Sequence, residues 1–375
     1  MDWELIVTLL LTLFAAAVLS FAITPLVRRF AGVIGAIDVP LDDRRMHKSP
    51  VPRLGGLAIF AGFMFSTLVF SDLNMPLRGI LIGAVIIVVL GCVDDVVRLH
   101  YAIKLVFQLA AALVVVLHGL VIDVLANPLF FWFGPEHIQL GVMSAPFTII
   151  WIMALTNAVN FIDGLDGLAC GVSLIGSVSL LVIALVKGSP EVALLMAALC
   201  GGCLGFLPFN LNPAKLFMGD TGATFLGFIL ATASIQGLFK MYAIISFAVP
   251  FLILGLPIFD IFVSVFRRLF SGKSPAHADR SHIHHRLIDM GFSQKQAVTI
   301  LYVISAILGL TAVVLTTAGE VRAIMVLLAV MVAVTIGYTI LRPKAGAAQG
   351  AAKTDASEPE ENDAADPDSA GKKDK

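Results

Sequence analysis

The chain has 375 residues, of which 58% are apolar and only 14% are charged. Soluble domains carry about 25% charged residues, so this composition excludes an ordinary soluble domain and indicates a polytopic membrane protein. The net charge of −1 argues neither for nor against an anionic partner. The charged residues are segregated along the chain, and their placement is more informative than their sum.

A helix that crosses a bilayer needs about 20 mainly apolar residues. We therefore expect an all-α polytopic membrane protein with about eleven transmembrane helices and one membrane domain over residues 1–341. The expected spans are 4–26, 54–71, 77–93, 102–122, 145–161, 168–187, 191–208, 221–239, 241–266, 297–317 and 322–341.

Most Lys and Arg residues lie in the loops that follow the odd-numbered spans. The loops on the other side hold only Arg78, Lys187, Lys240 and Arg322. Basic residues favour the cytoplasmic side, so we expect the amino terminus outside and the carboxyl terminus in the cytoplasm. Residues 342–375 are rich in Ala, Gly, Lys and Asp, which predicts a disordered acidic cytoplasmic tail.

Five polar clusters fall on the predicted cytoplasmic side, and charges at the ends of membrane helices are functional candidates. Five clusters on one face indicate one shared site. In chain order they are DDRRMHKSPVPRLGG (Asp42 to Gly56), Asp94-Asp95 with Arg98, the segment from Asn157 to Gly167, the segment from Asn210 to Gly222, and HADRSHIHHRL (His277 to Leu287).

The clusters combine acidic and basic side chains in a way that suits phosphate chemistry. Five carboxylates (Asp94, Asp95, Asp163, Asp166 and Asp220) are too many to sit together without cations. Hard divalent ions take oxygen ligands, and Mg²⁺ shares substrate phosphates. Basic residues interleaved with them would neutralise the charge of a bound phosphate. They are Arg98, Lys104, Lys215, Arg280 and Arg286. The pattern predicts a nucleotide or pyrophosphate bound with Mg²⁺, or with Mn²⁺ as the alternative ion.

The acidic clusters also have plainer interpretations. Asp94 and Asp95 could form a solvated helix end that pairs locally with Arg98, and Asp220 could cap the helix that follows it. Asn157, Asn160 and Asp163 recur at three-residue steps and therefore share a helix face, which a plain turn would not require.

The histidine run allows three interpretations. His277, His282 and His285 could bind zinc, although no thiolate is near, or the run could be a basic loop. We favour imidazoles that hydrogen-bond phosphate or sugar oxygens. Asp260, in the ninth span, could pair with Arg267 inside the protein or belong to the site; both remain open.

The motifs NFIDGLDGLA, FMGDTG and HADRSHIHHRL, in this order, resemble the polyprenyl-phosphate N-acetylhexosamine-1-phosphate transferase superfamily, glycosyltransferase family 4. The resemblance covers residues 1 to about 341. The histidine run is closer to the branch that uses UDP-GlcNAc than to the phospho-MurNAc-pentapeptide branch, in which a three-histidine run is typical.

This resemblance implies transfer of a sugar-1-phosphate from a UDP-sugar to undecaprenyl phosphate, with release of UMP. The site would face the cytoplasm from the bacterial inner membrane. The resemblance further implies that Asp220 binds magnesium with help from Asn160, and that Asp94, Asp95, Asp163 and His282 are catalytic. The implied substrate-binding residues are Arg53, Arg98, Lys104, Asn157, Asn160, Asp166, Lys215, His277, Arg280, His284 and His285.

The chain differs from some members of the superfamily at one position of the aspartate motif. Some members have a third acid shortly after the aspartate pair, and Arg98 stands there in this chain. Two other functions remain as alternatives: the same chemistry with another UDP-N-acetyl sugar, including phospho-MurNAc-pentapeptide, and a secondary transporter of an anionic solute. No nucleic-acid polymer is expected as a partner, and a homodimer is compatible with the sequence without being required by it.

Overall fold

The computed structural model describes residues 3–39, 50–126, 137–239, 244–260, 262, 283–318 and 322. All of these belong to one unit, Met1–Leu327, while the second unit, Leu328–Lys375, lies outside the described residues. The predicted eleventh span and the predicted acidic tail fall almost wholly outside this description and stay predictions.

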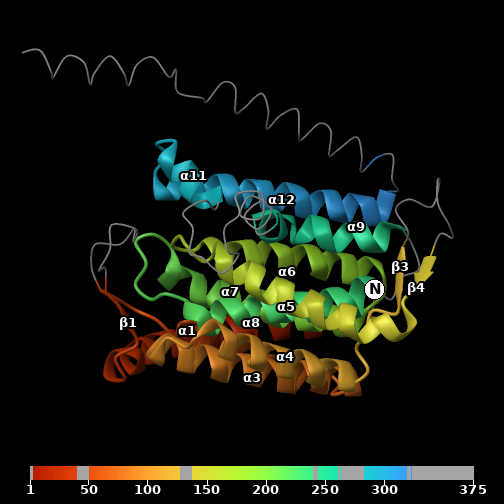
Figure 1. The fold of residues 1–375 in the computed structure, drawn as a ribbon, viewed down its shortest axis with the longest axis horizontal. Helices are drawn as coiled ribbons and strands as arrows, with labels where there is room; N and C mark the ends of the chain where they lie inside the picture. The colour runs from red at the N-terminus through yellow and green to blue at the C-terminus, as the bar shows by residue number, and fades with distance from the viewer. Residues whose placement is uncertain are drawn as a thin grey trace, which may run out of the picture. The chain divides into compact units, whose positions relative to one another are not determined.

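Helices dominate the described residues and lie side by side with roughly parallel axes (Figure 1). The helices are α1 (Trp3–Val33), α2 (Gly56–Phe70), α3 (Met75–Val97), α4 (Tyr101–Leu117), α5 (Ser144–Ile162), α6 (Leu168–Val186), α7 (Pro190–Asn210), α8 (Gly219–Ser234), α9 (Ile244–Ile253), α11 (Ile283–Asp289) and α12 (Gln294–Ala318), with short 3₁₀ and π segments at Gly141–Met143 and Ile235–Phe239.

The lengths and composition of these helices identify a multi-pass membrane protein. Within the described residues, six helices are long and apolar enough to cross a bilayer, and α2 and α4 are shorter apolar helices. The first eight predicted spans each coincide with one of the helices α1 to α8, and the tenth coincides with α12. Large apolar side chains such as Leu10, Phe14 and Val89 are exposed on the bundle, as expected of a surface that faces lipid.

Several helices begin where local chemistry favours a start. Asn74 caps α3 by accepting a hydrogen bond from the Leu77 backbone N–H at 3.0 Å, and Pro190 occupies the first turn of α7. Ser293 and Gln296 form a reciprocal capping pair before α12. Such caps satisfy N–H groups that have no partner within the helix.

Helix α8 is the central element of the bundle. Every residue from Thr221 to Ser234 is buried, and the helix packs against α2, α3, α5 and α6. The Phe225 ring makes edge contacts with Phe60 and Phe63 of α2. A helix that is apolar on all sides belongs in the interior of a protein, and the start of α8 is thereby fixed relative to its neighbours.

Two short antiparallel ladders depart from the all-α expectation. β1 (Ile37–Asp38) pairs with β2 (Val51–Pro52), with Ile37 opposite Pro52, and β3 (Val124–Ala126) pairs with β4 (His137–Gln139), with Leu125 opposite Ile138. These segments connect helices, so the bundle itself remains helical, and the ladders lie at opposite ends of it (Figure 1).

Candidate active site

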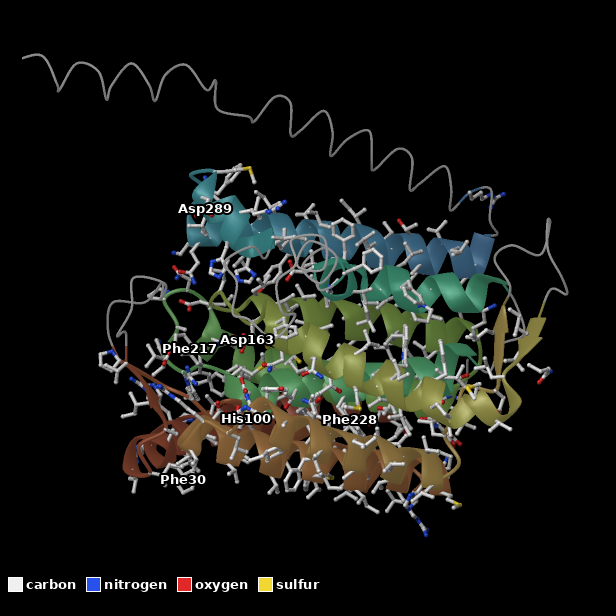
Figure 2. The ribbon with its side chains drawn as sticks, viewed as in Figure 1. Phe30, His100, Asp163, Phe217, Phe228 and Asp289 are labelled. Carbon is white, nitrogen blue, oxygen red and sulfur yellow. The ribbon has the colours of Figure 1, made fainter. Side chains whose placement is uncertain are left out.

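The polar clusters gather at one end of the bundle. His100 before α4, Asp163 after α5, Phe217 before α8 and Asp289 in α11 all lie at the end opposite β3 and β4, whereas Phe228 lies midway along α8 (Figure 2). Segments separated by up to about half the chain therefore meet around the first turn of α8.

Two glycines allow this close approach. A Cβ atom on Gly91 of α3 would lie 2.4 Å from the Thr221 Cα atom, so only glycine lets α3 touch the start of α8 here. Gly219 has a positive φ of 71°, and a Cβ there would lie 2.3 Å from an Asp95 carboxylate oxygen. Both the conformation and the space at residue 219 therefore require glycine.

Asp95 caps the start of α8. Its carboxylate accepts hydrogen bonds from the backbone N–H groups of Asp220 (2.9 Å) and Thr221 (3.1 Å), and from the Thr221 hydroxyl (2.6 Å). The side chain is buried, so these bonds offset the loss of water. Both Asp95 oxygens accept hydrogen bonds from α8. The catalytic role expected for Asp95 stays a prediction.

Asp94 lies beside a carboxylate from another helix, with a lysine between them. The Lys104 ammonium forms an ion pair with Asp94 and a second one with Asp220 at 2.6 Å. The other Asp94 oxygen accepts a hydrogen bond from the Leu99 N–H at 2.7 Å. Lys104, predicted to bind substrate, therefore joins the two predicted acidic residues into one array, which we call the Asp94–Lys104–Asp220 array.

Asp163 lies directly after α5, and its surroundings disfavour ionisation. Loss of hydration raises the pKa of its carboxyl to about 8, the negative charges of Asp220 and Asp95 add to the rise, and the Arg53 charge opposes it. Asp163 is thus close enough to the other acids for their charges to matter. The region carries a surplus of negative charge that a bound cation would relieve.

The two asparagines of α5 differ in their surroundings. Asn157 donates to the Gln108 side chain and to the Met153 carbonyl, each at 2.7 Å, and accepts from Gln108 at 3.3 Å. This pairing holds α5 against α4, and the predicted substrate contact of Asn157 stays a prediction. Asn160 lies one turn later, half-buried, and its carbonyl accepts from the Asp163 N–H at 3.2 Å.

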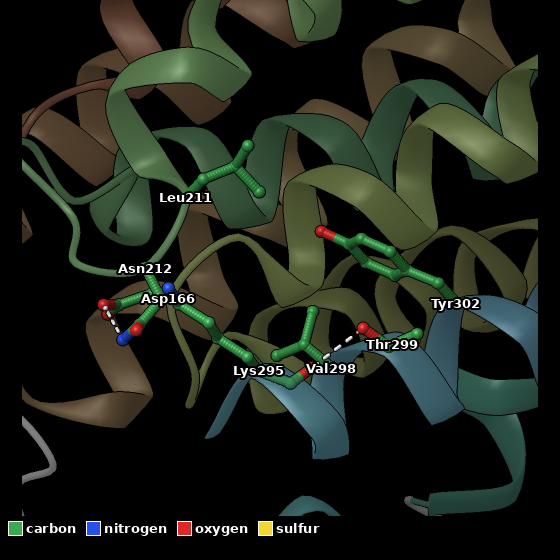
Figure 3. A pocket seen from close by; sticks show the side chains of 7 residues that line it. All are labelled: Asp166, Leu211, Asn212, Lys295, Val298, Thr299 and Tyr302. Carbon is green, nitrogen blue, oxygen red and sulfur yellow. Dashed lines mark hydrogen bonds between the residues drawn. The ribbon is translucent and has the colours of Figure 1, made fainter. Parts of the chain in front are cut away.

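Asp166 joins two loops of the site. Its Oδ2 atom accepts hydrogen bonds from the Asn212 side chain at 2.9 Å and from the Ala214 N–H at 3.0 Å. It also borders a cavity of about 270 Å³ between these loops and α12 (Figure 3). The residues that line the cavity are Asp166, Leu211, Asn212, Lys295, Val298, Thr299 and Tyr302.

The remaining predicted basic residues lie near this end. Arg53 pairs with Asp38 at 2.8 Å, and backbone bonds from Phe217 to Pro52 and from Gly55 to Phe217 tie its segment to the approach to α8. Arg98 is exposed at the end of α3, with a left-handed φ of 56°, and Lys215 is exposed in the loop before α8. Neither makes an ion pair that the structure records among its described residues.

The histidine cluster is described only in part. His277, Arg280 and His282 lie outside the described residues, as does Arg267, so their predicted roles stay predictions. His284 and His285 belong to α11, with ring centroids 4.3 Å apart. His284 is only 3% exposed and packs on Gly164. Its predicted contact with substrate stays a prediction.

The sequence reasoning missed three residues that the site uses: Gln108, Asp38 and the Thr221 hydroxyl. A signal existed for Gln108, because Lys104 and Gln108 stand four residues apart in an otherwise apolar helix and so share a face. The ion pair of Asp38 with Arg53 depends on the pairing of β1 with β2. Strands of two residues leave no recognisable pattern in a sequence.

The donor atoms at this end suit magnesium in their chemistry. Among the described residues, no group of three or more His, Cys, Asp and Glu could by itself hold a metal ion. Mg²⁺ is usually bound by one or two carboxylates together with substrate phosphates and water. Asp220 and Asn160 carry oxygen donors of the kind that such a site uses, and the negative charges around Asp163 favour a cation nearby.

Comparison with known proteins now identifies the class. The sequence model of the family "Glycosyl transferase family 4" matches residues 77–238, which include the Asp94–Lys104–Asp220 array. A Bacillus subtilis protein is 42% identical over 79% of this chain and 82% of its own length. The chain therefore belongs to glycosyl transferase family 4 and is a sugar-phosphate transferase.

The relatives carry related names. The Bacillus subtilis protein is named "Probable undecaprenyl-phosphate N-acetylglucosaminyl 1-phosphate transferase". A Mycobacterium tuberculosis protein, 33% identical over 76% of this chain and 77% of its own, is named decaprenyl-phosphate N-acetylglucosaminephosphotransferase. An Escherichia coli K12 protein, 29% identical over 79% of both chains, is named undecaprenyl-phosphate alpha-N-acetylglucosaminyl 1-phosphate transferase.

Proposed function

We propose that the protein transfers GlcNAc-1-phosphate from UDP-GlcNAc to undecaprenyl phosphate and releases UMP. The observation that carries this proposal is the Asp94–Lys104–Asp220 array at the end of an apolar bundle. Its lysine can bind phosphate, and its carboxylates can bind a metal ion. The array lies where a membrane lipid and a soluble nucleotide could meet. The names of the three relatives support the choice of sugar and lipid.

The reaction exchanges one phosphoanhydride bond of the sugar-1-phosphate for another. An oxygen of the lipid phosphate attacks the phosphorus that bears the sugar, the pyrophosphate bond breaks, and UMP leaves with the bond's electron pair. The second pKa of a phosphate monoester is near 6, so the acceptor is already a competent nucleophile at neutral pH. We therefore favour direct attack over a covalent aspartyl intermediate.

The residues of the array would act by position and charge. Asp94 would accept any proton left on the lipid phosphate, and Lys104 would exchange part of its carboxylate pairing for contact with the pyrophosphate. Asp220 and Asn160 would hold Mg²⁺, which when bound supplies neutralisation of the pyrophosphate and of the departing UMP. Phosphoryl transfer depends mainly on such positioning and electrostatics.

The proposed orientation follows from the substrates. UDP-sugars are soluble and made in the cytoplasm, so the end that holds the array would face the cytoplasm from the bacterial inner membrane. The lipid acceptor would reach this end through the bilayer. A homodimer is compatible with this arrangement, and neither substrate requires one.

The test is a reconstituted reaction with a panel of donors. Purified protein is incubated with undecaprenyl phosphate, MgCl₂ and UDP-GlcNAc, UDP-GalNAc or UDP-MurNAc-pentapeptide, and lipid products are identified by mass. We expect a lipid-linked GlcNAc pyrophosphate and stoichiometric UMP. Product from another donor alone would replace the proposed sugar, and solute uptake into liposomes without any product would favour a transporter.

The histidine run is tested in the same assay. We expect His282→Ala to lower turnover, because an imidazole there would contact phosphate or sugar oxygens. Metal analysis of the purified wild-type protein separates this role from zinc binding. Stoichiometric zinc that His282→Ala removes would contradict the phosphate-contact interpretation.

A further inference from the structure

A buried carboxylate outside the array is attached to the histidine helix. Asp260 lies in a helical segment that includes residues 255–260, and it is only 3% exposed. Its Oδ1 atom accepts a hydrogen bond from the Ile283 backbone N–H at 2.8 Å. A buried carboxylate is costly unless it is hydrogen-bonded, so this contact helps to explain why an acid is tolerated in such an apolar segment.

The bond reaches the first residue of α11. The N–H groups in the first turn of a helix have no partner inside the helix, and negative charge is favoured at that end by the helix dipole. Asp260 supplies both the acceptor and the charge for Ile283, whose side chain also packs against the core. The carboxylate therefore fixes where α11 begins, across 23 residues of chain.

The position of α11 matters because the next residue packs on the acidic loop. The His284 ring lies against Gly164, between Asp163 and Asp166, and a Cβ atom on Gly164 would lie only 2.2 Å from His284 Nε2. His285 lies beside His284 and is only partly buried. A shift of α11 would move both imidazoles relative to the Asp163–Asp166 loop.

We infer that Asp260 is a positioning residue that sets α11 and its histidines against the Asp163–Asp166 loop. It acts through the Ile283 N–H and not on the reacting atoms. This inference rests on the proposed function, because it assigns the fit between α11 and the loop to binding of the nucleotide-sugar donor. It favours a role of Asp260 in the site, while the predicted partner Arg267 lies outside the described residues.

The first experiment compares two replacements of the same branched shape. Asp260→Asn keeps an oxygen acceptor, whereas Asp260→Leu removes it, and Asp289→Asn changes an exposed acid of α11 as a control. We expect Asp260→Leu to raise the donor KM about tenfold, with an unchanged KM for undecaprenyl phosphate. Asp260→Asn should restore most of the loss, and Asp289→Asn should match the wild type.

The second experiment removes the backbone N–H of Ile283, which donates the hydrogen bond to Asp260. Ile283→Pro deletes the N–H at the first position of α11, where proline is tolerated, and Ile283→Val keeps the N–H in a side chain of similar volume. Hydrogen exchange of residues 284–289 is then followed by mass spectrometry. We expect faster exchange in Ile283→Pro and Asp260→Leu, and wild-type exchange in Ile283→Val.

The two readouts separate this inference from the proposed function. Absence of product in the wild type would contradict the proposed function, while the exchange measurement would still report on the Asp260 contact. Wild-type exchange in both Asp260→Leu and Ile283→Pro would overturn the positioning role. Equal rises of the donor and acceptor KM values in Asp260→Leu would also overturn it, because general loosening of the fold would affect both substrates.

Discussion

Asp94 and Asp95 are adjacent in the sequence and have different partners. Asp95 bonds the backbone of α8 with both oxygens, whereas Asp94 pairs with Lys104, which also reaches Asp220. Successive residues on a helix point in different directions, so the two carboxylates meet different neighbours. The sequence indicated that both acids matter and could not indicate which one faces α8.

Removal of Asp95 should therefore cost stability. Asp95→Ala leaves two N–H groups and the Thr221 hydroxyl without their acceptor, and we expect a loss of about 3 kcal/mol in the free energy of unfolding. Asp94→Ala should cost less, because Lys104 retains Asp220 as a partner. Thermal unfolding in detergent measures both, and a larger loss in Asp94→Ala would contradict this division.

Replacement of Asp220 should affect chemistry and spare the fold. Asp220→Asn keeps its size and its backbone bonds to Asp95, while it loses the charge that pairs with Lys104 and would hold magnesium. We expect no magnesium-dependent lipid-linked sugar and a normal elution profile in detergent. Normal turnover in this variant would rule out the metal assignment.

The raised pKa of Asp163 predicts a pH dependence of stability without metal. The folded protein keeps the proton up to about pH 8, whereas the unfolded chain loses it near its ordinary value of 3.8. The unfolded state therefore binds fewer protons in this window, and stability should fall as pH rises through it. In EDTA, the thermal midpoint should decline more in the wild type than in Asp163→Asn; equal slopes would contradict the raised pKa.

At the scale of helices, the start of α8 is held by contacts that exclude side chains. Gly91 of α3 lies against Thr221, and Gly56 of α2 lies against Gly222, where a Cβ atom would come within 2.1 Å of the backbone nitrogen. Close packing between membrane helices commonly depends on small residues. These contacts bring Asp94 and Asp95 to Asp220, so the geometry of the Asp94–Lys104–Asp220 array depends on helix spacing.

A single methyl group should test this dependence. We expect Gly91→Ala to push α3 from α8, to lower turnover at least about tenfold, and to destabilise the protein by about 1–3 kcal/mol. Gly32→Ala is the matched control, because a Cβ atom on that α1 residue meets nothing within 4 Å. Turnover and the thermal midpoint are compared, and wild-type values for Gly91→Ala would contradict the proposed spacing.

The helices were predictable from the sequence to a large extent, whereas their contacts were not. Apolar runs of sufficient length located α1 to α8 and α12, because burial in lipid demands them. The breaks before Asp163 and Asp220 follow from Gly164, Gly167 and Gly219. The pairing of Asn157 with Gln108, and of Asp166 with Asn212, depends on which helices become neighbours, and apolar periodicity does not encode that choice.

At the scale of the whole molecule, the bundle has two chemically different ends. One end carries the Asp94–Lys104–Asp220 array with α11 and its histidines, and the other carries β3 and β4. Figure 1 labels α11 and these two strands. The excess of Lys and Arg on the loops at the array end predicts that this end faces the cytoplasm.

Cysteine labelling in intact cells tests the orientation. Arg98 and Lys187 are both exposed and lie at the ends of α3 and α6, on opposite sides of the bundle. We expect a membrane-impermeant maleimide to label Lys187→Cys in intact spheroplasts and Arg98→Cys only after permeabilisation. The wild type, with three of its four cysteines buried, serves as the background control; the reverse pattern would invert the topology.

The bond from Asp95 to the start of α8 has a consequence for biogenesis. The carboxylate leaves the ribosome about 125 residues before the Thr221 and Asp220 N–H groups that satisfy it. Until α8 is inserted, α3 carries an acid without its final partners at the membrane boundary, where such groups are expensive. Assembly of the site is therefore a late event in synthesis, and chains truncated before α8 should be substrates for membrane quality-control proteases.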